Sequence, residues 1–361
     1  MNRKSIYFFI LCTVFVLQCS PSMQITKPQA GDTLRYPDEK HLKNVTQLTF
    51  GANNAEAYWS FDSKQLTFQS DNPAWGNGCD QIFRLPLGGD YTKEPVHISN
   101  GTGRTTCSYF MPGNKQILFA STQAAGKECP PAPDRSSGKY VWAVYNSFDI
   151  YVSDLDGKQV KQLTNTPGYD AEATVSPKGD KIVFTSVRNG DLDLYTMNID
   201  GSNVKQVTNI LGYDGGAFFS PDGTKLVFRA SRPQTEDAKK EYLDLLHQDL
   251  VQPLNMEIFV CNMDGSNLHQ VTHLGKANWA PFYLPDNQHI IFSSNHAGTR
   301  GYSFNLFMIS EEGTGLEKIT SDKTFDAFPM FSPNGKYLVF ASNRFNGGGH
   351  DTNLFVAEWV K

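Results

Sequence analysis

The hydrophobic and polar positions of the chain follow one pattern that recurs six times. Each repeat has an apolar strand, a turn of the Ser-Pro-x-Gly type, a second apolar strand, and an acidic or amide residue that opens an aromatic strand. Proline fixes φ in such a turn, and glycine accepts the positive φ that closes a hairpin. The turns lie at Ser60–Ser63, Met111–Asn114, Ser176–Gly179, Ser220–Gly223, Leu284–Asn287 and Ser332–Gly335.

A strand rich in branched and aromatic residues follows each turn, with the alternation that predicts β-structure. These second strands are predicted at Gln65–Phe68, Gln116–Phe119, Lys181–Phe184, Lys225–Phe228, His289–Phe292 and Lys336–Phe340. Third strands open at Asp80, Asp149, Asp193, Glu257, Asn305 and Asn353, and a fourth strand ends in Thr or Ser, as at Thr164. Each repeat is therefore predicted to be a four-stranded propeller blade.

The two ends of the chain predict how the ring of blades closes. Val45 to Thr49 has the pattern of a fourth strand with no blade before it, and the chain ends after a third strand near Trp359. Pairing the first strand with the last blade leaves no exposed sheet edge. The predicted fold is an all-β, six-bladed propeller of antiparallel blades, closed by the N-terminal strand.

Two insertions interrupt the repeats, at residues 122–147 in blade two and 234–256 in blade four. The first carries Tyr140, Trp142 and Tyr145, and we expect it to cover the central pocket. The second is predicted to be a helix capped by Thr235 and ended by Pro253. Its apolar side would pack on its own propeller or, alternatively, dock another protein.

The N-terminus has the pattern of an export signal: Arg3 and Lys4 precede an apolar run that is too short to span a bilayer. This run ends near Cys19 and resembles the lipobox of bacterial lipoproteins, which implies acylation of Cys19; ordinary signal cleavage nearby is the alternative. The predicted organisation is a signal peptide at 1–19, a tether at 20–44 and the propeller at 45–361. Ser20 gives no aspartate-type retention signal, which implies a location on the periplasmic side of the outer membrane.

The repeat as a whole closely resembles the TolB-like propeller repeat. Its Ser-Pro-Asp-Gly turns, the Ser-x-Arg that follows the second strand, and the Asp-(Ile/Leu)-Tyr strand starts carry the resemblance from about Val45 to Val360. TolB itself has an additional N-terminal α/β domain, for which the residues between Cys19 and the first strand leave no room. The resemblance implies a fold that serves as a binding platform, as an accessory domain of peptidases, and occasionally as a lyase.

Acidic and polar residues recur near the starts of the innermost strands, and we expect them to ring the channel mouth. They are Glu56, Arg104, Asp170, Asp214, Asn278 and Asp326. Converging carboxylates could hold Ca²⁺ or a cationic group of a partner, or could bond neighbouring turns. Arg188, Arg232 and Arg344 are expected to pair with nearby acids such as Asp193. The net charge of −5 leaves no basic field for nucleic acid.

Histidines and cysteines suggest two further features. A resemblance to propeller-type oligogalacturonate lyases, which hold a divalent metal through histidines, makes His273, His296 and His350 candidate metal ligands. Cys79, Cys107 and Cys129 map to the insertion face, where one disulfide involving Cys129 would pin the first insertion. Cys261, inside a strand, is expected to be a buried free thiol.

Three functions from different classes remain. The favoured one is a non-enzymatic lipoprotein of the cell envelope that binds a protein, a peptide or a cell-wall ligand on the insertion face. The second is a metal-assisted lyase acting on carbohydrate. The third is a structural subunit of an envelope complex, docked through the helical insertion.

Overall fold

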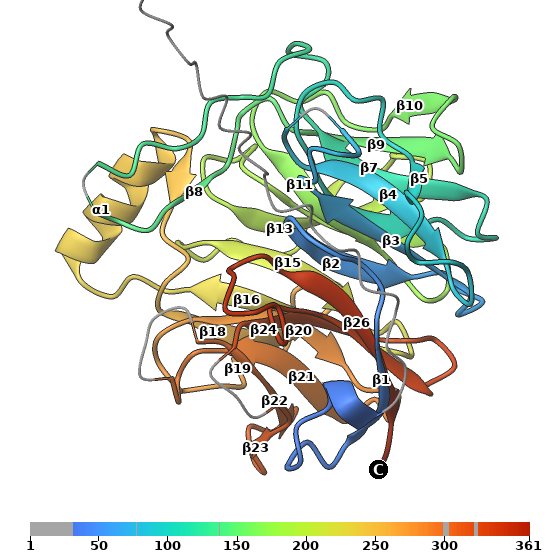
Figure 1. The fold of residues 1–361 in the computed structure, drawn as a ribbon. Helices are drawn as coiled ribbons and strands as arrows, with labels where there is room; N and C mark the ends of the chain where they lie inside the picture. Colours follow the sequence, from blue (N-terminus) through green and yellow to red (C-terminus); the bar gives the residue numbers. More distant parts are fainter. Residues whose placement is uncertain (1–31, 77, 137, 299–302, 321–323) are drawn as a thin grey trace, which may run out of the picture.

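A computed structural model describes residues 32–76, 78–136, 138–298, 303–320 and 324–361. It confirms the predicted six-bladed propeller: six antiparallel sheets of four strands each surround a common centre (Figure 1). Each innermost strand contacts the innermost strands of both neighbouring blades, so these strands form a closed ring. The proposed lipidation residue, Cys19, lies outside the described residues.

The strands of each blade follow the chain from the centre outward. Blade one contains β2 (Asn54–Trp59), β3 (Gln65–Ser70), β4 (Gln81–Pro86) and β5 (Val96–His97). Blade two contains β6 (Thr105–Phe110), β7 (Gln116–Ser121), β9 (Asp149–Asp154) and β10 (Val160–Gln162). Blade three contains β11 (Asp170–Val175), β12 (Lys181–Ser186), β13 (Asp193–Asn198) and β14 (Lys205–Gln206).

The other half of the ring repeats this order. Blade four contains β15 (Asp214–Phe219), β16 (Lys225–Ser231), β18 (Met256–Asn262) and β19 (His269–Gln270). Blade five contains β20 (Asn278–Tyr283), β21 (His289–Ser294), β22 (Asn305–Ser310) and β23 (Glu317–Lys318). Blade six contains β24 (Asp326–Phe331), β25 (Tyr337–Ser342), β26 (Asn353–Trp359) and β1 (Leu42–Gln47).

The repeated hydroxyl residues hold each blade together. The Ser220 hydroxyl oxygen accepts hydrogen bonds from the backbone N–H groups of Thr224 and Lys225, which fixes the hairpin of blade four. At the end of the fourth strand of blade three, Thr208 accepts from the backbone N–H of Leu194 and donates to Asp193. The recurring Thr and Asp of the sequence pattern are therefore structural, because they satisfy backbone groups at the blade edge.

The first strand closes the ring as predicted, because β1 pairs antiparallel with β26 at the edge of blade six (Figure 1). It begins at Leu42, a little before the predicted start at Val45. Leu42 and Val45 are buried against Phe331 and Phe355 of the same blade. The first and last parts of the chain thus share one hydrophobic core.

The described part of the predicted tether packs on blade six and is not a free linker. It includes the 3-10 turn η1 (Asp32–Leu34) and the fully buried carboxylate of Glu39. The two terminal guanidinium nitrogens of Arg344, Nη2 and Nη1, donate hydrogen bonds to the Glu39 carboxylate at 2.9 and 3.2 Å. Nη2 also donates to the Asp326 carboxylate at 3.3 Å. Burial of such a triad is tolerated because each charge is paired and hydrogen-bonded.

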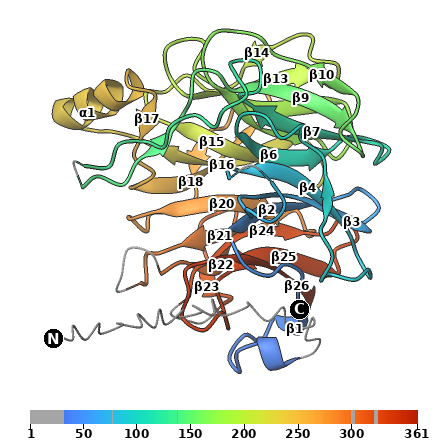
Figure 2. The same ribbon diagram turned by 45° about the horizontal axis from the view of Figure 1, so that its top comes forward.

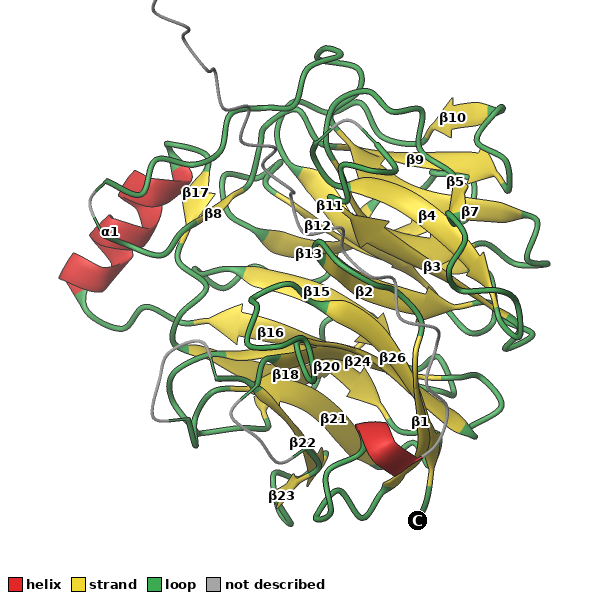
Figure 3. Cartoon of the chain, viewed as in Figure 1, coloured by secondary structure: helices red, strands yellow, loops and turns green. Residues whose placement is uncertain are grey.

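The two insertions leave the ring on one side and join each other. Helix α1 (Glu236–Leu246) begins after Thr235, whose hydroxyl accepts from the N–H of Ala238 as predicted (Figure 3). It ends at Leu246, so the prediction of a helix reaching Pro253 was wrong. The following residues form β17 (Leu250–Val251), which lies beside α1 (Figure 2). This strand pairs with β8 (Trp142–Ala143) of the first insertion (Figure 3), and the pairing satisfies backbone groups that a longer helix would have used.

The apolar side of α1 packs on its own propeller. Leu246 is buried and Tyr242 is partly buried in a cluster with Val251 and Tyr213, and the Tyr242 hydroxyl donates to Asp191 at 2.5 Å. Within the described part of the chain, no helix is long and apolar enough to cross a bilayer.

The triad around Arg344 yields a first prediction. Arg344→Met would leave two buried carboxylates without a cation, and we expect the free energy of unfolding to fall by about 3–5 kcal/mol. Arg188→Met, at the same position of blade three, should cost less, because Arg188 is partly exposed and pairs with the single carboxylate of Asp170. Urea unfolding followed by circular dichroism measures both, and equal losses would contradict this account.

Candidate ligand-binding cavity

A cavity of about 1040 Å³ lies at the centre of the ring, on the face that carries the first insertion. All six innermost strands contribute to its wall, and described residues of the first insertion, from Ala132 to Tyr145, line it as well. Twelve of the 30 described lining residues are aromatic: Tyr58, Tyr140, Trp142, Tyr145, Phe148, Tyr169, Tyr213, Phe218, Trp279, Phe304, Phe325 and Phe328. Small-molecule sites have volumes of about 300–1000 Å³. The volume of this cavity is at the upper limit of that range, so the cavity can hold a small-molecule ligand.

A β-bulge in each innermost strand decides which side chains reach this cavity. The register with the second strand shifts after the second residue in all six blades. The third residue has a positive φ in every case, and all six third residues line the cavity: Glu56, Cys107, Glu172, Gly216, Ala280 and Phe328. Bulges re-aim side chains, and here they form a ring around the centre.

The largest polar feature of the ring is a buried ion pair. Glu172 Oε1 lies 2.5 Å from Arg229 Nη2, and both side chains are about 9% exposed. The Tyr213 hydroxyl donates to Glu172 at 2.5 Å. Burial alone would raise the pKa of Glu172, but Arg229 and the hydrogen bonds from Tyr213 and Thr185 outweigh it and hold this pKa below its usual value.

Space for this ion pair is made by two consecutive glycines. A Cβ on Gly216, where φ is +59°, would lie 1.9 Å from Arg229 Nη1, and one on Gly215 would lie 2.4 Å from Glu172 Oε2. Glu172 also accepts a hydrogen bond from the backbone N–H of Gly216 at 2.8 Å. The glycines of β15 thus allow a close approach that no other residue would permit.

Glu56 is the second acidic member of the ring, and it has a different environment. Its Oε2 accepts hydrogen bonds from the Tyr58 hydroxyl and the Cys107 thiol, both at 2.9 Å. Burial raises the pKa of Glu56 above its ordinary value, against the effect of these two donors. Burial and the nearby Glu56 carboxylate also raise the pKa of Cys107 well above its usual value, so its thiol remains protonated and can donate.

The first insertion forms a lid that contacts the buried ion pair. Trp142 lies 5.4 Å from the Arg229 guanidinium, measured to the ring centre, and packs 5.0 Å from the Trp279 ring. The Trp142 indole N–H donates to the Tyr140 hydroxyl. Tyr140 and Leu254 both line the cavity and are 44% and 41% exposed, so they mark its solvent-facing side.

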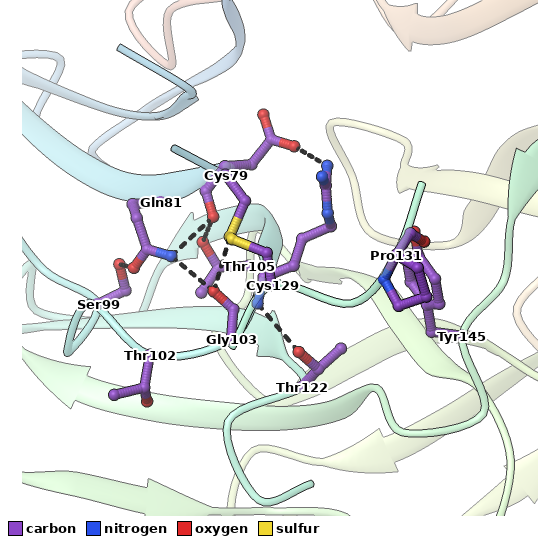
Figure 4. Close-up of a disulfide and its surroundings, with 12 residues drawn as sticks. Cys79, Gln81, Ser99, Thr102, Gly103, Thr105, Thr122, Cys129, Pro131 and Tyr145 are labelled. Atoms are coloured by element: carbon purple, nitrogen blue, oxygen red, sulfur yellow. Dashed lines mark hydrogen bonds and ion pairs between the residues drawn. A yellow bond between two sulfur atoms is a disulfide. The ribbon is translucent and has the colours of Figure 1, made fainter. Parts of the chain in front are cut away.

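A disulfide between Cys79 and Cys129 fastens this lid to the loop before β4 (Figure 4). Near it, the Gln81 amide donates to the Gly103 carbonyl oxygen, and Tyr145 donates to the carbonyl oxygen of Pro131. Cys107, the remaining candidate of the sequence analysis, is a free thiol in the cavity wall, and Cys261 is a buried free thiol.

Of the six residues expected at the channel mouth, Glu56 and Arg104 line the cavity. Arg104 forms an ion pair with Asp80, which also faces the cavity. The other four lie inside their blades and are at most 1% exposed: Asp170, Asp214, Asn278 and Asp326. These four residues are the first residues of the innermost strands, whereas the third residues face the cavity. The expected ring of six polar side chains around the channel mouth therefore does not form.

The buried aspartates pair with the arginines that follow the second strands. Asp170 binds Arg188, Asp214 binds Arg232, and Asp326 binds Arg344. The expected pairing of these arginines with nearby acids is confirmed, but Asp193 is not one of the partners. Asp193 instead accepts hydrogen bonds from Gln206 and Thr208. Burial and the charge of Asp191 raise the pKa of Asp193 to about 7.

The three candidate metal-binding histidines belong to three different blades. His296 occupies the position that arginine holds in blades three, four and six: it contacts Ser294 at 3.0 Å and packs 4.4 Å from the ring of Phe307. His273 contacts Gln270, and His350 is exposed. Within the described ranges, no three His, Cys, Asp or Glu side chains are grouped to hold a metal ion, so these residues do not fit one.

Comparison with known proteins agrees with this architecture. Residues 130–244 match the model of the TolB beta propeller domain. A putative TolB from Agrobacterium tumefaciens superposes with a TM-score of 0.56 at 19% identity, over 86% of this chain and 91% of that chain. This chain has the TolB-like propeller fold.

Two further solved structures share this TolB-like propeller. TolB from Acinetobacter baumannii has a TM-score of 0.56 at 17% identity, over 83% of this chain and 64% of that protein. An oligogalacturonate lyase from Vibrio parahaemolyticus has a TM-score of 0.54 at 12% identity, over 88% of this chain and 93% of that one. At these identities the likeness establishes the fold, which hosts more than one function.

Several cavity residues of this TolB-like propeller were not found from the sequence. Glu172, Arg229, Trp279 and Phe328 reach the cavity through the bulge or by tertiary packing. One signal was present: Gly215 and Gly216 stand inside a predicted innermost strand, where glycine often marks a bulge or a close approach.

Gly216→Ala tests the packing of the ion pair. The new methyl would displace a guanidinium that Glu172, Tyr213 and Trp142 hold in place, and we expect the free energy of unfolding to fall by about 3 kcal/mol. Gly315→Ala is the control, because Gly315 also has a positive φ but has open space around its Cβ position; it should cost about 1 kcal/mol. Urea unfolding measures both, and equal costs would show that the ion pair is not tightly packed.

Proposed function

We propose that this chain is a lipoprotein of the cell envelope that binds a peptide or cell-wall fragment in the cavity of its propeller. The observation that carries the proposal is the cavity itself: about 1040 Å³, lined by aromatic rings and covered by the first insertion. Aromatic walls with a small number of fixed polar groups are typical of ligand sites. Tyr140, Trp142 and Tyr145, expected from the sequence to form the lid, all belong to this wall.

The size of the cavity favours a ligand segment over a folded protein. A protein partner would need to reach the cavity by inserting a side chain or a chain end past the lid. The disulfide and the β8–β17 pairing attach the lid at two places, to blade one and to the insertion of blade four. Such preorganisation lowers the entropic cost of binding.

The two alternative functions have less support. The lyase hypothesis rests on the shared fold and on His273, His296 and His350, which lie on separate blades. The hypothesis of a structural subunit needs the apolar side of α1 as a docking element, and that side is packed against the propeller through Leu246 and Tyr242. A Ca²⁺ site at the channel mouth lacks the converging carboxylates it would need, because Asp170, Asp214 and Asp326 are paired inside their blades.

Filling the cavity tests the binding function. Ala280→Phe places a ring at the bulged position of blade five. The equivalent position of blade six already carries a phenylalanine, Phe328, with a similar positive φ. Peptides and fragments released from digested peptidoglycan would be incubated with the full chain and recovered by mass spectrometry. We expect the variant to retain at least tenfold less of the bound set than the wild type.

The control is Ala297→Phe, which adds the same ring at an exposed site that does not line the cavity. It should bind as the wild type does. If Ala280→Phe recovers the same fragments in the same amounts, the ligand lies elsewhere and the proposal is wrong.

The lipid anchor is tested by Cys19→Ser in the full chain. Loss of the acylated residue should move the processed protein from the membrane fraction to the soluble fraction after cell disruption. Cys12→Ser, within the apolar run of the signal, should remain with the membrane. A processed Cys19→Ser protein that still sediments with membranes would contradict lipidation at this residue.

A further inference from the structure

We propose that the cavity binds its ligand through a positively charged ammonium or guanidinium group that is placed against Glu56. The inference rests on the proposed binding function of the cavity and names the chemistry of its ligand. Glu56 lines the cavity at the bulged position of β2. Its Oε2 accepts the two hydrogen bonds from Tyr58 and Cys107, and in the described chain neither a donor to Oε1 nor an ion-pair partner is found.

The other carboxylates of the cavity wall are already neutralised. Glu172 is paired with Arg229, and Asp80 is paired with Arg104. Glu56 is thus the carboxylate of the described lining that forms no ion pair, and the Arg229 charge acts on it only from a distance. A partly buried carboxylate without a counter-ion has lost part of its hydration, and a ligand cation placed there would offset that cost.

Aromatic rings around the cavity favour the same sign of charge. Phe328 is the bulged residue of blade six. Blade six adjoins blade one, which carries Glu56. Trp279 and Phe304 stack with ring centres 4.2 Å apart on the adjoining wall. The face of an aromatic ring carries partial negative charge and attracts ammonium and guanidinium groups.

An anionic ligand is less well served by the arginines of the wall. Arg229 is held by Glu172 and lies over the rings of Trp142 and Tyr213. Arg104 is held by Asp80. Arg135 belongs to the lid, is exposed, and lies over the Tyr140 ring, so solvent and salt screen its charge. The described inner wall of the cavity therefore presents one carboxylate without an ion-pair partner, Glu56, whereas its two arginines, Arg229 and Arg104, are already paired.

Three probes of one shape and different charge test the inference on the full chain: phenethylammonium, 2-phenylethanol and 3-phenylpropionate. Binding is followed by the tryptophan fluorescence of Trp142 and Trp279 and by calorimetry at pH 8. We expect the ammonium to bind at least tenfold more tightly than the alcohol, and the carboxylate to bind most weakly. Glu56→Gln should reduce the preference for the ammonium over the alcohol to less than twofold.

A control variant separates the charge of Glu56 from the loss of charge elsewhere on the chain. Glu94→Gln removes the same charge at an exposed site and should keep the preference. If Glu56→Gln retains the full preference, or if the wild type binds the ammonium no better than the alcohol, the inference is wrong.

A measurement on the wild type avoids dependence on a variant that folds poorly. Because burial raises the pKa of Glu56 above its ordinary value, the carboxylate form that binds a cation should increase as the pH rises through this raised pKa. Ammonium affinity should rise with it, while alcohol affinity stays constant. The groups facing Glu56 should not titrate there: Tyr58 and Cys107 have raised pKa values and remain neutral, Glu172 has a lowered pKa and remains charged, and Arg229 remains a cation. An ammonium affinity that is flat with pH would overturn the inference.

The outcomes also separate the inference from the proposed function. Equal, saturable binding of all three probes, abolished by Ala280→Phe, would retain the cavity as a binding site and reject the role of Glu56. Saturable binding of none of them would reject both.

Discussion

The pairing of β1 with β26 is the interaction on which the rest of this molecule depends. Without it the sixth blade would lack its outer strand, and the ring of innermost strands would be held by packing alone. The chain reinforces this closure at one further point, where Arg344 of blade six joins Asp326 of its own blade to Glu39 of the N-terminal segment. A closed ring fixes the distance between opposite blades, and that distance creates the central cavity.

A second constraint operates inside the ring and decides what the cavity presents. Each innermost strand bulges at its third residue, so the side chain that would otherwise stay in the blade faces the centre. Because the backbone conformation is shared by all six blades, the chemistry of the ring depends on the residue type alone. Glu56, Cys107 and Glu172 make one half of this ring polar, whereas Gly216 and Ala280 leave space and Phe328 adds an aromatic face. The two acids of the polar half differ, because Arg229 forms an ion pair with Glu172 but not with Glu56.

The lid connects these features to the outside of the ring. Its disulfide attaches it to blade one, its short strand pairs with the insertion of blade four, and Trp142 lies against Arg229. Two insertions far apart in the sequence therefore act as one cover. The sequence indicated the lid and its aromatic residues, but the end of α1 and the β8–β17 pair were set by a contact between the insertions, which local helix propensity cannot report.

The amino-acid sequence by itself determined the number of blades, the strand order, the closure by the first strand and the sites of insertion. These follow from turn residues and from alternation, which are local and recur with the repeat. The sequence also located Glu56 and Arg104, but it placed Asp170, Asp214, Asn278 and Asp326 beside them. A bulge moves the following side chains to the opposite face of a strand. In five of the six blades no glycine marks the bulge in the sequence, so the alternation of residues along the strand does not show which side chains face the centre. Only tertiary packing buries those four residues in their blades, brings Arg229 of blade four to Glu172 of blade three, and leaves Glu56 without an ion-pair partner in the described chain.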